Sequence, residues 1–165
     1  MCCHIRTAIV EFYSHRYLIN STAIFKSPLV HPRLYMSGTE IGSALNSFSQ
    51  ATDWQGKFFS PKFKQGVIGF SIDDFVSKFS PQFPTHIKID VDGIENRIVE
   101  GGRETIADSR LKSMLVELDE NQPELTRPVI TAIEQAGLKL SVKKHASMFD
   151  NSEFASVYNH IFYRP

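Results

Sequence analysis

Residues 86–102 read HIKIDVDGIENRIVEGG, and this stretch carries the clearest structural signal in the chain. Its first six residues form a short β-branched run that ends at Asp92-Gly93, which predicts a strand followed by a turn. The apolar residues after the turn share one helical face, and they are Ile94, Ile98 and Val99. Gly101-Gly102 interrupts or ends that helix, and Ile106 could continue a second turn. The stretch therefore predicts a strand, a turn and a helix in direct succession.

The residues after 102 continue this alternation. LKSMLVEL, residues 111–118, predicts the next strand, and Pro123 suits the first position of a helix that Gly137 closes. Residues 138–142 and 156–163 predict two more strands. Strands that alternate with helices favour an α/β fold with a doubly wound, mostly parallel, Rossmann-like sheet. No helix separates the last two strands, so we expect the C-terminal strand to be antiparallel.

The residues before 86 give weaker signals. Residues 8–13 and 17–24 carry β-branched and aromatic side chains and predict two short strands. The Ser- and Gly-rich stretch 37–57 predicts a loop. In SIDDFV, Ser71 can cap a helix and the two acids suit its first turn, so we expect a helix to start there.

The composition fits one globular domain of 165 residues, with 42% hydrophobic and 22% charged residues. The 18 Lys+Arg balance the 18 Asp+Glu, so we expect no nucleic-acid partner held by bulk electrostatics. No apolar run is long enough to span a membrane. Cys2 and Cys3 are adjacent and cannot form a disulfide framework, so we expect a cytoplasmic setting.

Two carboxylates, Asp90 and Asp92, stand where the strand 86–91 ends. In open α/β sheets ligands bind beyond the carboxyl ends of the strands, so these residues are the first candidates for a functional site. A structural alternative stays open, in which Asp92 caps the next helix and Asp90 accepts hydrogen bonds from loop amides. Another is the metal-binding Asp-x-Asp motif of nucleotide-sugar glycosyltransferases. A calcium loop is excluded, because Ile94 and Glu95 stand where it needs Asp or Asn and then Gly.

Lys88 lies within the same strand, where an unpaired charge is costly to bury. We therefore expect a charged partner, with Glu117 on the neighbouring strand as the first candidate. A role beside a substrate hydroxyl is the alternative.

Residues 88–102, KIDVDGIENRIVEGG, resemble the central motif of the FkbM-type methyltransferases. That family typically reads Lys-Ile-Asp-Val-Glu-Gly-x-Glu, followed by an apolar pair and Gly-Ala. Seven positions agree in order, namely Lys88, Ile89, Asp90, Val91, Gly93, Glu95 and Gly101. Asp92 replaces the usual Glu, and Gly102 stands where Ala is common. The flanking segments SIDDFV, LVEL and YNHIFYRP match as well, so the resemblance covers residues 34–165 and leaves residues 1–33 unmatched.

The resemblance implies methyl transfer from S-adenosylmethionine to a hydroxyl of a small molecule or sugar, on a Rossmann-like sheet and without a metal. It implies that Asp90 orients or deprotonates the acceptor hydroxyl. Lys88, Asp92 and Glu95 are the supporting residues of this site. Asp90 and Gly93 are also expected to contact the cofactor.

The family's Gly-rich turn after the first strand, where the methionine end of the cofactor sits, is missing from residues 1–33. The resemblance therefore implies the C-terminal part of a domain, without its first three strands. A non-catalytic remnant or interaction module is the alternative from another class. Without its neighbours, the central strand 86–91 becomes an apolar edge. We expect self-association or a companion chain at that edge, unless residues 8–13 or 17–24 supply a substitute strand.

Overall fold

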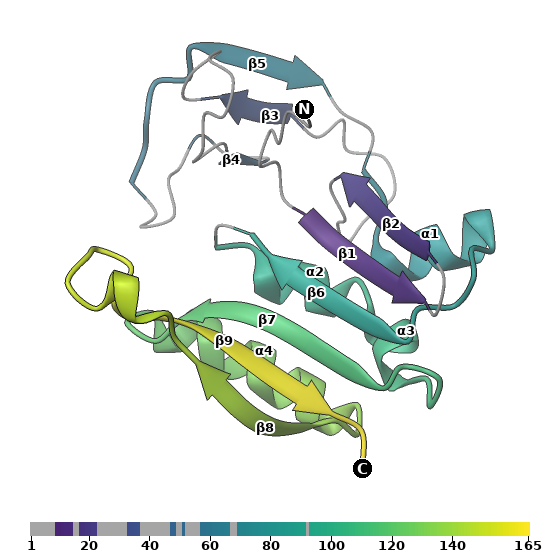
Figure 1. Cartoon of the computed structure of the whole chain (residues 1–165). Coiled ribbons are helices and arrows are strands. Elements are labelled where there is room, and N and C mark those ends of the chain that lie inside the picture. Colours follow the sequence, from purple (N-terminus) through teal and green to yellow (C-terminus); the bar gives the residue numbers. More distant parts are fainter. Residues whose placement is uncertain are drawn as a thin grey trace.

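The computed structural model describes residues 9–14, 17–22, 33–36, 47–48, 51, 57–66, 69–91 and 93–165. Within these ranges the chain forms a six-stranded sheet, a separate three-stranded sheet and a layer of helices (Figure 1). The chain is thus a mixed α/β protein, as the sequence predicted.

The larger sheet has the strand order β2-β1-β6-β7-β9-β8. Its strands are β1 (Ile9–Ser14), β2 (Tyr17–Thr22), β6 (His86–Asp90), β7 (Ser113–Asp119), β8 (Lys139–Lys144) and β9 (Val157–Tyr163). The smaller sheet consists of β3 (Arg33–Met36) between β4 (Ser47–Phe48) and β5 (Phe63–Gly66), with both pairs antiparallel. The predicted loop 37–57 therefore contains the short strand β4.

The prediction that most neighbouring strands of the larger sheet are parallel is wrong. Only β6 and β7 pair in parallel, whereas β1–β2, β1–β6, β7–β9 and β8–β9 are antiparallel. The antiparallel C-terminal strand was predicted correctly: β9 lies between β7 and β8 and runs opposite to both. Consequently β6, β7 and β8 still point the same way. Strands β7 and β8 are parallel but do not pair with each other, because β9 lies between them.

The two strands predicted near the N-terminus are present as β1 and β2. They pair with each other, and β1 also pairs along the full length of β6, with Glu11 in register with Lys88. The expected exposed edge of β6 is therefore covered by a substitute strand. In the part of the chain that the structure describes, the sheet ends at β2 instead.

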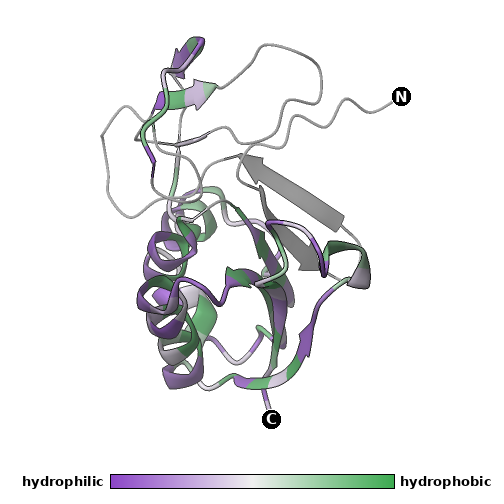
Figure 2. Cartoon of the chain, turned by 90° about the vertical axis from the view of Figure 1, so that its left-hand side faces the viewer, coloured by the Kyte–Doolittle hydropathy of each residue, from purple (hydrophilic) through white to green (hydrophobic). Residues whose placement is uncertain are grey.

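The helices are α1 (Ile72–Phe79), α2 (Glu95–Glu100), α3 (Arg103–Ala107) and α4 (Pro123–Gln135), with a 3-10 turn η1 (Ser147–Phe149). Among the described residues, no helix is long and apolar enough to cross a membrane. Helices α1 to α4 all lie on one side of the larger sheet (Figure 2), so the expected doubly wound arrangement is not observed. The reason lies in the connections. The crossovers β6–α2–α3–β7 and β7–α4–β8 step in the same direction along the sheet, and right-handed crossovers of one direction place their helices on one face.

The buried core fills the space between this helix layer and the sheet. Alternate residues of β6 and β7 point into it and are almost fully buried, as are the apolar positions of the helices. These side chains include Ile87, Ile89, Met114, Val116, Leu118, Ile98, Val99, Ile106, Val129, Ile133 and Phe162.

Helix α1 is fixed at its start by two side chains. Ser71 Oγ accepts a hydrogen bond from the backbone N–H of Asp74 at 2.9 Å, which confirms the predicted cap. Asp73 has a further role, because its carboxylate accepts hydrogen bonds from the N–H groups of Glu104 and Thr105 at 3.0 and 2.8 Å. One acid in the first turn of α1 thus caps α3 and holds the two helices together.

The penultimate residue, Arg164, joins three distant segments. Its guanidinium donates hydrogen bonds to the backbone oxygens of Leu111, Ala136 and Ile106, at 2.9, 3.0 and 2.6 Å. The carbonyl of Leu111 lies just before β7, that of Ala136 at the end of α4, and that of Ile106 near the end of α3. Gly137 allows this contact, because a Cβ atom there would lie 2.7 Å from Arg164 Nη1.

We expect Arg164→Lys to lower the free energy of unfolding by about 2 kcal/mol or more, since hydrogen bonds to charged groups contribute about 1.5–3 kcal/mol each. A single ammonium group cannot replace the planar fork that reaches three carbonyls. Urea unfolding of both proteins measures the difference. The matched control is Arg103→Lys, because Arg103 is largely exposed and its ion pair with Glu100 is long, at 3.8 Å. Equal stability of the two variants would contradict the role assigned to Arg164.

Candidate functional site

The candidate site is built on the polar face of β6. Ile87 and Ile89 point into the core, so the intervening Lys88 and Asp90 lie on the opposite face, away from the helices. Lys88 is in register with Leu115 of β7 on one side and with Glu11 of β1 on the other. Both residues thus lie in the interior of the sheet, and Asp90 ends the strand.

Lys88 and Asp90 form an ion pair, with Lys88 Nζ 2.8 Å from Asp90 Oδ2. Their side chains are 34% and 30% exposed, so the pair remains open to solvent. Residues two apart on a strand share a face, and the long lysine side chain spans the distance between them. The sequence indicated correctly that Lys88 needs a charged partner, and the structure shows one in Asp90 on the same strand. The predicted pairing with Glu117 stays a prediction.

The turn after β6 is held by a second pair of predicted site residues. Gly93 adopts a left-handed conformation, with φ of 84°, and its N–H donates a hydrogen bond to Glu95 Oε1 at 3.1 Å. Glu95 is only 8% exposed and begins α2. Glu95 and Gly93 therefore fix the shape of the turn that follows Asp90.

Asp92, the remaining predicted site residue, lies outside the described residues. The residue that precedes α2 is Ile94, which makes no side-chain cap, although its carbonyl accepts hydrogen bonds from the N–H groups of Arg97 and Ile98 at 3.0 and 3.2 Å. Among the described residues, no three His, Cys, Asp or Glu side chains come together in a way that could hold a metal ion.

The paired carboxylate of Asp90 retains chemical capacity. An ionised carboxylate offers about four lone-pair positions, which is more than one ion pair uses. The side chain sits at the carboxyl end of a strand and is partly exposed, which suits a group that meets a ligand. This arrangement can bind and orient a hydroxyl, and it can accept the proton of that hydroxyl.

The side of β6 where a cofactor cradle is expected is occupied by the N-terminal hairpin. A dinucleotide-type cradle needs a strand that leads through a Gly-rich turn into a helix, whose N-terminus faces the ligand. Here β1 runs antiparallel to β6 and the next described element is β2, which pairs with β1. The described residues on this side therefore do not fit S-adenosylmethionine.

Further polar residues gather where β7 ends, and the sequence did not single them out. Asp119 closes β7, and its carboxylate accepts hydrogen bonds from Asn121 N and Gln122 Nε2, both at 3.0 Å. Burial alone would raise the pKa of Asp119, but the hydrogen bonds from Ser156, Gln122 and Asn121 leave it below its usual value. This residue shapes the entry into α4.

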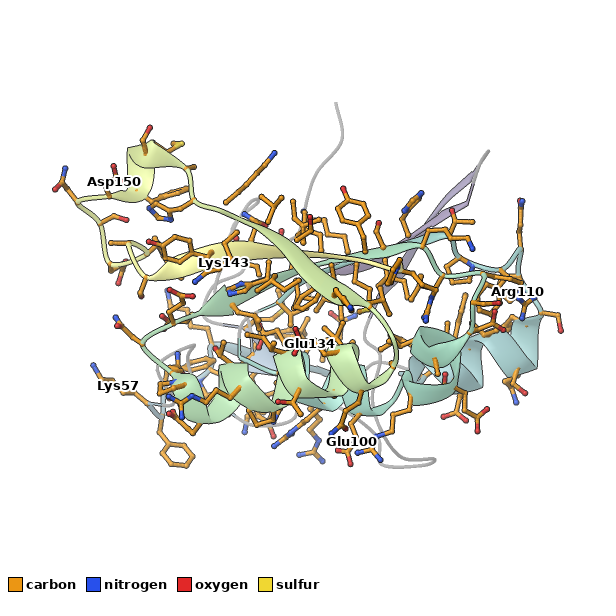
Figure 3. All side chains as sticks on the ribbon, turned by 90° about the horizontal axis from the view of Figure 1, so that it is seen from below. Lys57, Glu100, Arg110, Glu134, Lys143 and Asp150 are labelled. Atoms are coloured by element: carbon orange, nitrogen blue, oxygen red, sulfur yellow. The ribbon has the colours of Figure 1, made fainter. Side chains whose placement is uncertain are left out.

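Glu120, Lys143 and His160 form a cluster next to this turn. Lys143 Nζ pairs with Glu120 Oε1, which also lies 3.5 Å from His160 Nε2. Figure 3 shows Lys143 and Asp150 toward one end of the sheet and Arg110 at the other. His160 is 1% exposed, and its Nδ1 lies 3.1 Å from the carbonyl oxygen of Tyr158, so that nitrogen carries a proton. Burial, together with the charge of Lys143, lowers the pKa of His160 despite the opposing effects of Tyr158 and Glu120.

We expect this buried histidine to make stability depend on pH. Because the pKa of His160 in the folded chain is below its ordinary value of 6.5, the unfolded chain takes up the proton first as pH falls. The melting temperature should therefore drop as pH falls below about 6.5, and His160→Asn should flatten this drop. His86→Asn, at an exposed position of β6, is the control and should keep the wild-type profile. An unchanged slope in His160→Asn would contradict the assignment.

Comparison of the chain with models of protein families, with curated proteins and with solved structures found no match.

Proposed function

We propose that this chain is the acceptor-binding part of an S-adenosylmethionine-dependent O-methyltransferase, which acts on a hydroxyl of a small molecule or sugar. The observation that carries the proposal is the Lys88–Asp90 ion pair, about a third exposed to solvent at the carboxyl end of β6. The same residues carry the resemblance of the KIDVDGIE segment to the FkbM-type methyltransferases. The direction of β6, β7 and β8, with β9 antiparallel between the last two, also suits the C-terminal part of a Rossmann-like sheet.

In this proposal Asp90 acts on the acceptor, and the other residues position Asp90. Asp90 accepts a hydrogen bond from the acceptor hydroxyl and takes its proton as the oxygen becomes a nucleophile. Lys88 holds the carboxylate in one orientation, which limits the positions that the hydroxyl can take. Gly93 and Glu95 keep the turn in place, so that Asp90 does not move relative to the core. Lys88, Gly93 and Glu95 are thus positioning residues.

In this proposal the cofactor is held by residues outside the described part of the chain or by a companion chain, because the described residues around β1 do not fit S-adenosylmethionine. The same observation favours a second candidate, a non-catalytic interaction module. The β1–β2 hairpin covers β6 where the cofactor-binding strands would pair. A remnant that has lost catalysis would also need such a strand to cover the edge of β6.

We expect free monosaccharides to shift the backbone amide resonances of Lys88, Asp90 and Gly93 in ¹⁵N-labelled protein, and Asp90→Asn to abolish these shifts. Glu134→Gln is the matched control, because Glu134 lies on α4, on the helix side of the sheet (Figure 3). The acceptor-binding proposal fails if the shifts survive in Asp90→Asn. A chain that shows no shifts with any hydroxyl compound but is well folded supports the interaction module.

We expect calorimetry with S-adenosylmethionine alone to show weak binding or none, because the Gly-rich turn is missing and β1 is antiparallel. A dissociation constant in the low micromolar range would mean that the N-terminal third has been misread. The amide shifts with monosaccharides would still test the role of Asp90 separately, since they measure acceptor binding and not cofactor binding.

A metal-dependent glycosyltransferase that uses Asp90 and Asp92 is a rival with a distinct requirement. A cation bound to Asp90 would have to compete with the Lys88 ammonium group, 2.8 Å away. We therefore expect no manganese-dependent hydrolysis of nucleotide sugars. Hydrolysis that needs manganese and disappears in Asp92→Ala would replace the methyltransferase proposal.

A further inference from the structure

The two edges of the six-stranded sheet differ in how they are protected. Edge strands expose unpaired N–H and C=O groups, and proteins commonly guard them with lysines, bulges or short length. One edge is β8, which carries three lysines, Lys139, Lys143 and Lys144, and has a register irregularity between Leu140 and Val142. This edge uses two of the usual protective devices.

The other edge, β2, has none of these three devices within its described residues 17–22. Its sequence is YLINST, residues 17–22, which contains no charged residue, no proline and no glycine. Four of its six residues are of types enriched in strands or are large and apolar, and its register with β1 is regular over all six residues. The edges of the smaller sheet are no rival, because β4 has two residues and β5 has four.

We infer that β2 pairs antiparallel with β2 of a second copy of this chain, so that two six-stranded sheets join edge to edge. A twofold axis brings a strand against itself, so a strand can pair with itself only if its own residues do not repel one another. No like charges meet along β2, because it has no charges. The same operation on β8 would place Lys139 opposite Lys144, which is unfavourable.

The contrast between the edges also sets the size of the assembly. Pairing of β2 with β2 uses the unprotected edge of both copies, and the edges that remain are the two β8 strands. Since β8 is guarded, no further copy can add by the same route, and the assembly closes as a dimer. The inference does not depend on the proposed function, because β2 is separated from β6 by β1.

Size-exclusion chromatography with light scattering, over a wide range of protein concentration, tests this inference. We expect the wild-type chain to approach twice the mass of one chain and to grow no further. Asn20→Lys places a lysine on β2, like the lysines that β8 already carries, and should give a folded monomer. Ser141→Lys adds the same charge to the exposed outer strand β8 and should leave the dimer intact.

Three outcomes would overturn the inference: a wild-type monomer at every concentration, continued growth beyond two copies, or a folded Asn20→Lys variant that is still dimeric. Hydrogen exchange on the wild-type chain keeps the test valid if Asn20→Lys does not fold. The amides of β2 should exchange more slowly as concentration rises, whereas those of β8 should not change. Exchange in β2 that is independent of concentration would contradict the dimer.

Discussion

The two-residue period of β6 is the constraint on which the rest of the structure depends. Ile87, Ile89 and Val91 must face the helices, because they complete the core that α2 and α3 cover. A slip of one residue would turn Lys88 and Asp90 into that core, where unpaired charges are very costly. The register with β1 and β7 is thereby fixed, and so is the side of the sheet on which the ion pair lies. The candidate site is placed by its apolar neighbours.

The same local periodicity explains which parts of the fold could be predicted from the sequence. The strand at 86–91, the helix after Pro123 and the cap at Ser71 all follow from patterns within a few residues. The pairing of β1 with β6 could not be predicted in this way, because nothing in residues 9–14 specifies the direction in which they meet a strand more than 70 positions away. The contacts of Arg164 are equally non-local, and its place next to the C-terminus gave no sign of them.

In the candidate site, too, local features could be predicted from the sequence and contacts between distant segments could not. The alternation predicted that Lys88 and Asp90 share a face, but the sequence analysis did not predict that they pair with each other. Glu120, Lys143 and His160 come from three segments, and each looks by itself like an ordinary loop or strand residue. Only the antiparallel insertion of β9 between β7 and β8 brings them together. A sequence signal for such a cluster would have required knowledge of that strand order.

The Lys88–Asp90 ion pair contributes little to the stability of the fold. Each side chain is about a third exposed, and ion pairs at such positions contribute only about 0–1 kcal/mol to stability. Two uncharged residues suited to a strand would serve β6 at least as well, since β-branched side chains pack well on a sheet. The Lys88–Asp90 contact by itself therefore contributes little to stability. What the pair does supply is a partly exposed carboxylate at the end of a strand whose alternate residues are buried in the core, which is the property that the proposed acceptor site would use.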